Sequence, residues 1–226
     1  RDAKGSVLKH PNSSFVWQQL GLLPWKTVEK NLTLPLLLSQ HKIPAADCAH
    51  RAAAMIEELG LSGLENRWPA TLSGGQRQRV GIARALIMNP KLIIADECIS
   101  ALDVSIQAQV VNLMKDIQEE TQCAYLFIAH DLSMVKYISD RIGVLHLGYM
   151  AESGTKEEIF SHPVHPYTKS LLSAIPHPNP VVEKHRVALT YNYATSGIDY
   201  AKGTEHSVGG THTVLATDEE FDAWTK

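Results

Sequence analysis

Two short apolar runs separated by a helical pattern constrain the fold of this chain more than any other feature. Residues 91–96 and 124–129 are almost continuously apolar, as expected for strands that are covered on both faces. Strands that alternate with helices pair in parallel through right-handed crossovers. The sequence therefore predicts an α/β protein with a parallel sheet and flanking helices. The segment between the runs places apolar residues on one stripe of an amphipathic helix: Ile106, Val110, Leu113, Met114 and Ile117.

Acidic and histidine side chains stand at the carboxyl ends of both predicted strands. Asp96 and Glu97 end the first run, and His130 follows the second. Ligands of parallel sheets bind beyond the carboxyl ends of the strands, so these residues are expected to face one crevice. Taken alone, each has an ordinary alternative, because an Asp-Glu pair is common on surfaces and a lone histidine after a strand is usually structural.

A glycine pair at a predicted helix start is the strongest local signal. Residues 73–89 are predicted to form a helix, with Ser73 as N-cap and Gln76 three residues later, as in a capping box. Gly74 and Gly75 let the backbone approach an anion closely, and the free N–H groups and dipole of the helix favour a phosphate there. A plain Ser-Gly-Gly turn is the alternative for the tripeptide alone.

The remaining segments divide the chain into a core and a tail. Residues 45–67 are predicted to be helical, a short helix is expected at about 167–174, and the prolines around it mark a boundary. The tail is polar and weakly patterned apart from one short predicted helix near residues 218–224. We therefore predict one domain over residues 1–176 and an extension over residues 177–226.

Composition argues against several classes of protein. A net charge of −3 shows no basic excess, so no nucleic-acid partner is expected. Cys48, Cys98 and Cys123 lie far apart, which argues against a disulfide framework and against a zinc or iron–sulfur site. No run approaches ~18 uninterrupted apolar residues, and no signal peptide opens the chain, so membrane association is expected to come through a partner.

The motifs follow one another in the order and spacing of a known family. Residues 72–80 resemble the signature motif of ABC ATPases, and residues 92–97 are similar to their Walker B strand with its catalytic glutamate. Residues 100–103 look like the D-loop, and His130 resembles the switch histidine. Gln18, followed by Leu-Leu-Pro-Trp a few residues later, looks like the Q-loop glutamine.

The resemblance implies a fold and ligands. It implies an ABC-type core, similar to P-loop NTPases, with a helical subdomain at about residues 30–80, and with the N-terminal part of the core missing from the sequence as given. ATP and Mg²⁺ are the implied cofactors. Asp96 and Gln18 would hold Mg²⁺, directly or through water. Glu97 would position and deprotonate the attacking water, and His130 would contact the γ-phosphate.

The remaining implied site residues act between two subunits. In this family the signature of one subunit closes over the nucleotide of the other, so Ser73, Gly74, Gly75 and Gln76 would contact ATP held by a second ABC ATPase subunit. Asp103 of the D-loop would lie at that seam. The implied further partners are transmembrane permease subunits, sensed through the Gln18 loop, and indirectly an extracellular peptide-binding protein. The chain would lie at the cytoplasmic face of the cell membrane as a peripheral protein.

One segment is specific to a branch of the family. Residues 165–176, which begin His-Pro-Tyr-Thr, closely resemble the ATPases of oligopeptide and dipeptide importers, as do residues 100–110 and 125–132. Residues 18–38, however, look more like the Q-loop regions of other ABC importers. The sequence therefore predicts peptide import, with import of another small solute as the alternative.

Two departures from the family pattern restrict the prediction. No Gly-x-x-x-x-Gly-Lys-Ser/Thr occurs, so little in the chain binds the β- and γ-phosphates in cis. A fragment or truncated product is the simplest account, and a degenerate, non-catalytic subunit that lends only its signature to a partner is the alternative. Cys98 stands where the family usually has proline, which is expected to change loop stiffness more than chemistry.

A DNA-repair or chromosome-maintenance ATPase is a further alternative, because such proteins share the signature motif. They carry long heptad coiled coils, and this sequence contains none. The His-Pro-Tyr-Thr segment has no place in them either. Peptide import therefore remains the preferred prediction.

Overall fold

The computed structural model describes residues 13–39, 43–100, 102–175 and 188–226. The chain forms two compact units, residues 1–130 and residues 131–226, which are described separately below. Among the helices within the described ranges, none is long and apolar enough to cross a membrane.

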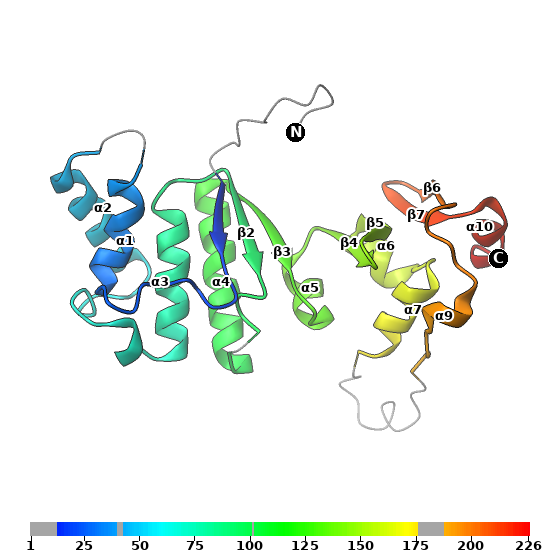
Figure 1. The fold of residues 1–226 in the computed structure, drawn as a ribbon, viewed down its shortest axis with the longest axis horizontal. Helices are drawn as coiled ribbons and strands as arrows, with labels where there is room; N and C mark the ends of the chain where they lie inside the picture. Colours follow the sequence, from blue (N-terminus) through cyan, green and yellow to red (C-terminus); the bar gives the residue numbers. More distant parts are fainter. Residues whose placement is uncertain (1–12, 40–42, 101, 176–187) are drawn as a thin grey trace. The chain divides into compact units, whose positions relative to one another are not determined.

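A three-stranded parallel sheet organises the first unit (Figure 1). Its strands are β1 (Ser13–Val16), β2 (Leu92–Asp96) and β3 (Ala124–Ile128), in the order β1-β2-β3. Val16 pairs with Ala95, and Ala95 pairs with Phe127. Both strands predicted from the apolar runs are confirmed, and so is their parallel pairing.

Helices connect these strands in the first unit. The segment between β1 and β2 contains α1 (Val28–Leu37), α2 (Ala45–Glu58), the short 3-10 helix η1 (Pro69–Thr71) and α3 (Gly74–Leu86). The crossover from β2 to β3 is α4 (Val104–Thr121), which buries Val110, Met114 and Ile117 on the predicted stripe. Helix α3 begins after Ser73 as predicted, and it ends slightly earlier than predicted, with Ile87 as C-cap.

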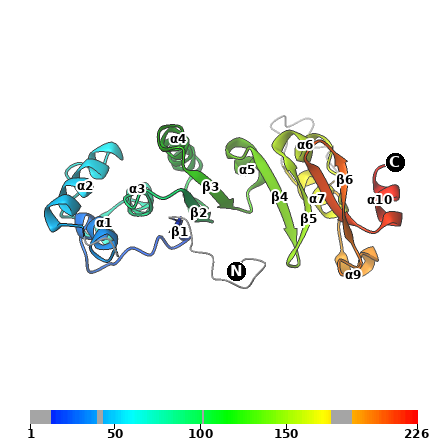
Figure 2. The same ribbon diagram turned by 90° about the horizontal axis from the view of Figure 1, so that it is seen from above.

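Helices α3 and α4 lie on one side of this sheet (Figure 2). Val16 and Ile93 are at most 1% exposed on the covered face. Phe15, Leu126 and Ile128 point to the opposite face, and between 41% and 51% of each is exposed. Parallel sheets are normally buried on both faces. The described part of the first unit therefore presents an apolar sheet surface.

A four-stranded antiparallel sheet organises the second unit. Its strands are β4 (Arg141–His146), β5 (Tyr149–Thr155), β7 (His212–Ala216) and β6 (Thr204–Gly209), in the order β4-β5-β7-β6. The helices of this unit are α5 (Leu132–Ile138), α6 (Lys156–Ser161), α7 (Pro166–Ser173), α9 (Tyr193–Ser196) and α10 (Asp218–Trp224). The helices predicted at about 167–174 and near 218–224 are confirmed.

The tail contributes more to this sheet than its composition predicts. β6 and β7 go beyond the single short helix expected there, and the pairing of β5 with β7 joins residues on both sides of position 176. The signal for them is the Gly209-Gly210 pair, which has φ of +147° and +58° and links the two strands in a hairpin. The boundary predicted at residue 176 stays a prediction.

Candidate active site

Three residues predicted for the site meet at the carboxylate of Glu97. Gln18 Nε2 donates a hydrogen bond of 3.0 Å to Glu97 Oε2. His130 Nδ1 lies 3.0 Å from Glu97 Oε1. Both carboxylate oxygens are thus engaged by side chains from distant parts of the sequence.

The order of the strands accounts for this meeting. Because β1, β2 and β3 are parallel neighbours, their carboxyl ends lie along one edge of the sheet. Gln18 follows β1, Glu97 follows β2 and His130 follows β3. The N–H of Glu97 also donates to the Ile128 carbonyl at 2.9 Å, which ties the ends of β2 and β3 together.

The backbone at Glu97 adopts an unusual conformation. Its φ of +43° lies in the left-handed region, which costs a non-glycine residue about 1–2 kcal/mol. Ser100 closes the turn, because its N–H and its Oγ donate to the Glu97 carbonyl at 3.2 and 2.8 Å. The surrounding hydrogen bonds hold the strained backbone and thereby fix where the carboxylate points.

The cluster remains open to solvent. The Glu97 side chain is 34% exposed and the His130 side chain is 68% exposed. A carboxylate fixed by two polar neighbours and reachable by water is suited to act as a general base. Such a base must lie within hydrogen-bond reach of the water that it deprotonates.

Asp96 and Cys98 flank Glu97 in the chain. Asp96 is half-buried at the end of β2, and Cys98 is 4% exposed. Burial, and in addition the charge of Asp96, raises the pKa of the Cys98 thiol to about 12. The thiol is therefore protonated near neutral pH and acts as a packing residue at this position.

The Ser-Gly-Gly-Gln segment forms the predicted capping box of α3. Ser73 Oγ accepts a hydrogen bond from the Gln76 N–H at 3.2 Å, and Gln76 Oε1 accepts one from the Ser73 N–H at 2.9 Å. A Cβ atom on Gly75 would lie only 2.9 Å from Ile106 Cγ2 on α4. Glycine at this position therefore allows α3 to approach α4 closely.

Asp103 is the N-cap of α4. Its Oδ1 accepts hydrogen bonds from the Ile106 N–H at 3.0 Å and from Ser105 Oγ at 2.8 Å. These bonds, the one from Ile106 above all, lower the pKa of Asp103. Within the described part of the chain, neither this cap nor the α3 cap forms a hydrogen bond with Glu97. The predicted site residues thus form two separate groups.

Two residues that were not predicted for the site hold the loop after Gln18, and the first is Arg84. Arg84 of α3 donates to the Leu20 carbonyl at 3.0 Å and also to the Gly21 carbonyl. An arginine on a helix that carries several others gives no signal of this contact.

The second residue that holds the loop is Asn31 of α1. It is 1% exposed, accepts the Leu23 N–H at 2.8 Å and donates to the carbonyls of Leu23, Lys26 and Thr27. Here the sequence does carry a signal, because an asparagine in register with buried leucines must satisfy its amide locally.

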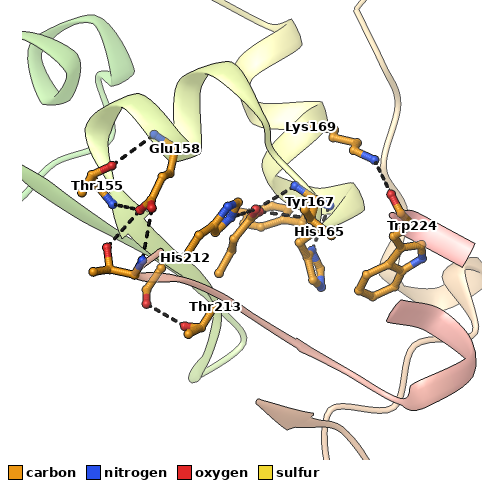
Figure 3. Close-up of polar contacts among 12 residues, drawn as sticks. Thr155, Glu158, His165, Tyr167, Lys169, His212, Thr213 and Trp224 are labelled. Carbon is orange, nitrogen blue, oxygen red and sulfur yellow. Dashed lines mark hydrogen bonds and ion pairs between the residues drawn. The ribbon is translucent and has the colours of Figure 1, made fainter. Parts of the chain in front are cut away.

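The His-Pro-Tyr-Thr segment opens α7 in the second unit (Figure 3). His165 is fully buried, and its Nδ1 accepts the Tyr167 N–H at 3.1 Å. The N–H groups of Val164 and His165 donate to the buried carboxylate of Glu152 at 2.7 and 3.1 Å. His212 Nε2 lies 2.7 Å from the same carboxylate. The segment thus lies in a buried polar network of the second unit.

The side chains of the first unit that could hold a metal ion are oxygen ligands. Among the residues that the structure describes, no group of three or more His, Cys, Asp and Glu side chains is arranged to hold a metal ion. Asp96 and Gln18 offer a carboxylate and an amide oxygen, the hard ligands that Mg²⁺ takes together with water and phosphate oxygens. This donor set fits Mg²⁺ whose remaining ligands come from a substrate.

Two family models match this chain. The model described as ABC transporter matches residues 4–100, and the model described as the oligopeptide/dipeptide transporter C-terminal region matches residues 151–195. The second match contains the His-Pro-Tyr-Thr segment. The first covers β1 to β2 and the Ser73–Gln76 cap.

Several proteins similar to this chain are named as ATP-binding proteins of peptide transport. The oligopeptide transport ATP-binding protein OppF of Bacillus subtilis (strain 168) is 47% identical over 210 residues, which cover 89% of this chain and 69% of that protein. The chain belongs to this family of ABC transporter ATP-binding proteins. Two other members are each 54% identical: DppF of Lactococcus lactis, named a dipeptide transport ATP-binding protein, and OppF of Streptococcus mutans.

This ABC family member spans only part of the length of these relatives. The alignment with DppF covers 79% of the chain and 58% of DppF, and that with the Streptococcus OppF covers 84% and 62%. The chain therefore spans more than half, but less than two thirds, of the length of these two relatives.

Solved structures of ABC proteins share the fold. A dimeric ATP-binding cassette in a post-hydrolysis state, bound to ADP and Pi, is similar with a TM-score of 0.56 and 32% identity, over 65% of this chain and 63% of that one. CbiO1 of Clostridium perfringens, part of an ABC transporter complex, is similar with a TM-score of 0.60 and 25% identity, over 67% of this chain and 60% of that one. The predicted α/β ABC ATPase fold is thereby confirmed.

Proposed function

We propose that this chain is the ATP-binding and ATP-hydrolysing subunit of an importer for oligopeptides or dipeptides, and that it carries the water-activating half of the ATPase site. The observation that supports the proposal is the carboxylate of Glu97, held at 3.0 Å by both Gln18 and His130 at the ends of three parallel strands. The family gives the context in which such a carboxylate activates water.

Glu97 is the proposed general base. The Gln18 amide and the Glu97 carboxylate together hold a water molecule, and a proton moves from that water to a carboxylate oxygen. Because each oxygen already accepts or shares one hydrogen bond, water binding requires one of these contacts to lengthen. The exposed ring of His130 is the group available to a phosphate oxygen.

The proposed cofactors are ATP and Mg²⁺, which supply the phosphoryl group and neutralise its charge when bound. Asp96 and Gln18 are the proposed Mg²⁺ ligands. Ser73, Gly74, Gly75 and Gln76 open α3, where free N–H groups and the helix dipole favour a phosphate. Since their cap forms no hydrogen bond with Glu97 in the described residues, we assign them to the nucleotide of a second subunit.

The proposed partners follow from the family. They are a second ABC ATPase subunit, with Asp103 at the seam, transmembrane permease subunits that this chain meets at the cytoplasmic face of the membrane and, indirectly, an extracellular peptide-binding protein. The relatives named for dipeptide and oligopeptide transport support the substrate class. The dimeric state of one similar cassette supports the pairing of two ATPase subunits.

A non-catalytic subunit is the second candidate. It is favoured by the cap of Ser73 and Gln76, which forms no hydrogen bond with Glu97 in the described residues and is free to act on a partner's nucleotide. Such a chain would neither bind nor hydrolyse ATP alone, and a catalytic partner would depend on Ser73 and Gly75 of this chain.

The deciding experiment is ATP hydrolysis by the purified chain, alone and with the subunits that co-purify with it. Glu97→Gln is expected to lower the rate at least about a hundredfold, because it removes the general base. Glu119→Gln, which changes an exposed glutamate of α4, is the matched control and should leave the rate unchanged. Hydrolysis that survives Glu97→Gln would refute the proposed base. Activity that requires Ser73 but not Glu97 would favour the non-catalytic subunit.

A further inference from the structure

The loop that carries Gln18 reverses sharply just after it. The loop leads from β1 to α1, past α3 (Figure 1). Leu20 and Gly21 both lie in the left-handed region, with φ of +57° and +55°. The turn is closed by hydrogen bonds from the Leu20 N–H to the Trp17 carbonyl at 2.8 Å and from the Gly21 N–H to the Gln19 carbonyl at 2.7 Å. The position of Gln18 therefore depends on this turn.

Arg84 fastens the turn to α3. Its guanidinium donates to the carbonyls of Leu20, at 3.0 Å, and of Gly21. Arg84 is half-buried, and burial lowers its pKa. A Cβ atom on Gly21 would lie 3.1 Å from Arg84 Nη2, so the guanidinium lies directly against the backbone. Two neighbouring carbonyls on one guanidinium use the planar donor fork that lysine lacks.

An apolar contact reinforces this attachment. Gly81 lies about one turn before Arg84 on α3, and a Cβ atom on it would lie only 2.9 Å from Leu20 Cδ2. Leu20 therefore packs on the helix while its carbonyl accepts from Arg84. Gln18 is thus fixed on one side by the turn on α3 and contacts Glu97 with its amide on the other.

We propose that Arg84 is a positioning residue that sets the reach of Gln18 onto Glu97 and couples it to α3, the helix that starts with the Ser73 cap. A displacement of α3 carries the carbonyls of Leu20 and Gly21 with it, and Gln18 follows. The proposal rests on the proposed function, because the Gln18–Glu97 contact bears on hydrolysis only if Glu97 activates water.

The first test needs no activity. Hydrogen–deuterium exchange of the purified chain is followed in Arg84→Ala and Arg84→Lys. The rate of amide exchange in residues 17–23 is expected to rise about tenfold in Arg84→Ala. It should rise in Arg84→Lys as well, because an ammonium group lacks the planar fork that donates to both carbonyls. Protection of β2 should stay unchanged, which shows that the fold is retained.

Arg79→Ala is the matched control for exchange. It removes a guanidinium from the same helix, but Arg79 donates to the Leu59 carbonyl at 3.1 Å and not to the Gln18 loop. Exchange of residues 17–23 should therefore stay at the level of the unchanged chain. Equal exchange of that loop in Arg84→Ala and Arg79→Ala would overturn the proposal.

The second test asks whether Arg84 acts through Gln18. In the hydrolysing complex, Arg84→Ala is expected to lower kcat about tenfold and to leave KM for ATP within about twofold. In a Gln18→Ala background it should cause no further loss, because two changes that remove the same contact are not additive. Fully additive losses would overturn the coupling.

Failure of the proposed function would give a different result. Glu97→Gln would then leave hydrolysis unchanged, while the exchange result for Arg84 would still hold.

Discussion

Glu152 in the second unit is a carboxylate with no contact to water. It is 1% exposed and is satisfied by the N–H groups of Val164 and His165 and by His212 Nε2. A buried charge that loses one partner keeps its desolvation cost without compensation. The His-Pro-Tyr-Thr segment and β7 are therefore linked through a single side chain of β5.

We predict that His212→Ala destabilises the second unit by about 3 kcal/mol, because it leaves the Glu152 carboxylate one partner short. Pulse proteolysis across a urea series, scored on the fragment that contains β5 and β7, measures the change. His162→Ala alters an exposed histidine nearby and should shift stability by less than about 0.5 kcal/mol. Equal losses in the two variants would contradict the role given to Glu152.

We also predict that the second unit loses stability as the pH falls from about 6.5 to about 4. Burial, and in addition the charge of His146, lowers the pKa of His165 to about 4 from its usual 6.5. In this window the unfolded chain binds a proton that the folded chain does not bind, so the free energy of unfolding falls by up to about 3 kcal/mol.

The urea series at about pH 7 and about pH 5 checks this sign. Burial also lowers the pKa of His146, which acts in the same direction. His165→Gln should therefore flatten the pH dependence without abolishing it. Glu158, whose pKa is lowered to about 2 chiefly by a hydrogen bond from the Thr155 backbone, contributes at lower pH. An unchanged slope in His165→Gln would show that another group is responsible.

At the scale of elements, α3 connects the two groups of candidate site residues. It begins with the Ser73 capping box and approaches α4 at Gly75, while Arg84 in its last turn holds the loop after Gln18. Because α3 is one continuous helix of 13 residues, the coupling proposed for Arg84 would connect the Ser73 cap to the loop after Gln18.

Ser73→Ala is predicted to cost about 1 kcal/mol of stability, because it removes the side-chain acceptor for the Gln76 N–H. Ser73→Thr keeps that acceptor and should lie within a few tenths of a kcal/mol of the unchanged chain. Hydrogen exchange of the first turn of α3 reports the loss locally. If both variants fray the turn equally, the cap does not stabilise α3.

The strands and helices that the sequence predicts best are those with strong patterns. The apolar runs at β2 and β3 and the stripe of α4 follow from periodicity, and parallel pairing then brings the strand ends together. The contact of both Glu97 oxygens with Gln18 and His130 depends on the φ of +43° at Glu97, which no pattern encodes. Arg84 is missed because its acceptors are backbone carbonyls of a distant loop.

At the scale of the molecule, the two units are built by different rules. The first is a parallel sheet with crossover helices, whereas the second is an antiparallel sheet in which the inner strand β7 and the edge strand β6 come from the tail. β7 is five residues long, and it is buried where β5 and β6 pair with it on either side. Tertiary context of this kind overrides local propensity.

We predict that a chain ending at residue 203 loses the fold of the second unit and keeps that of the first. The truncation removes β6, β7 and His212, which opens the edge of β5 and leaves Glu152 without its histidine. Hydrogen exchange should show full exposure of β4 and β5, with β2 still protected. Removal of residues 225–226 alone, both exposed, is the control and should preserve protection throughout. Protection of β5 in the shorter chain would contradict this account.

The apolar face of the three-stranded sheet links the abundance of this protein to whatever covers that face. Phe15, Leu126 and Ile128 are exposed on the described part of the first unit, and apolar surface of this kind favours association with other chains. By mass action, a segment that covers this face stabilises the unit in proportion to the logarithm of its concentration. Cellular abundance of the protein should therefore rise and fall with whatever occupies that face, even where every residue of the chain stays the same.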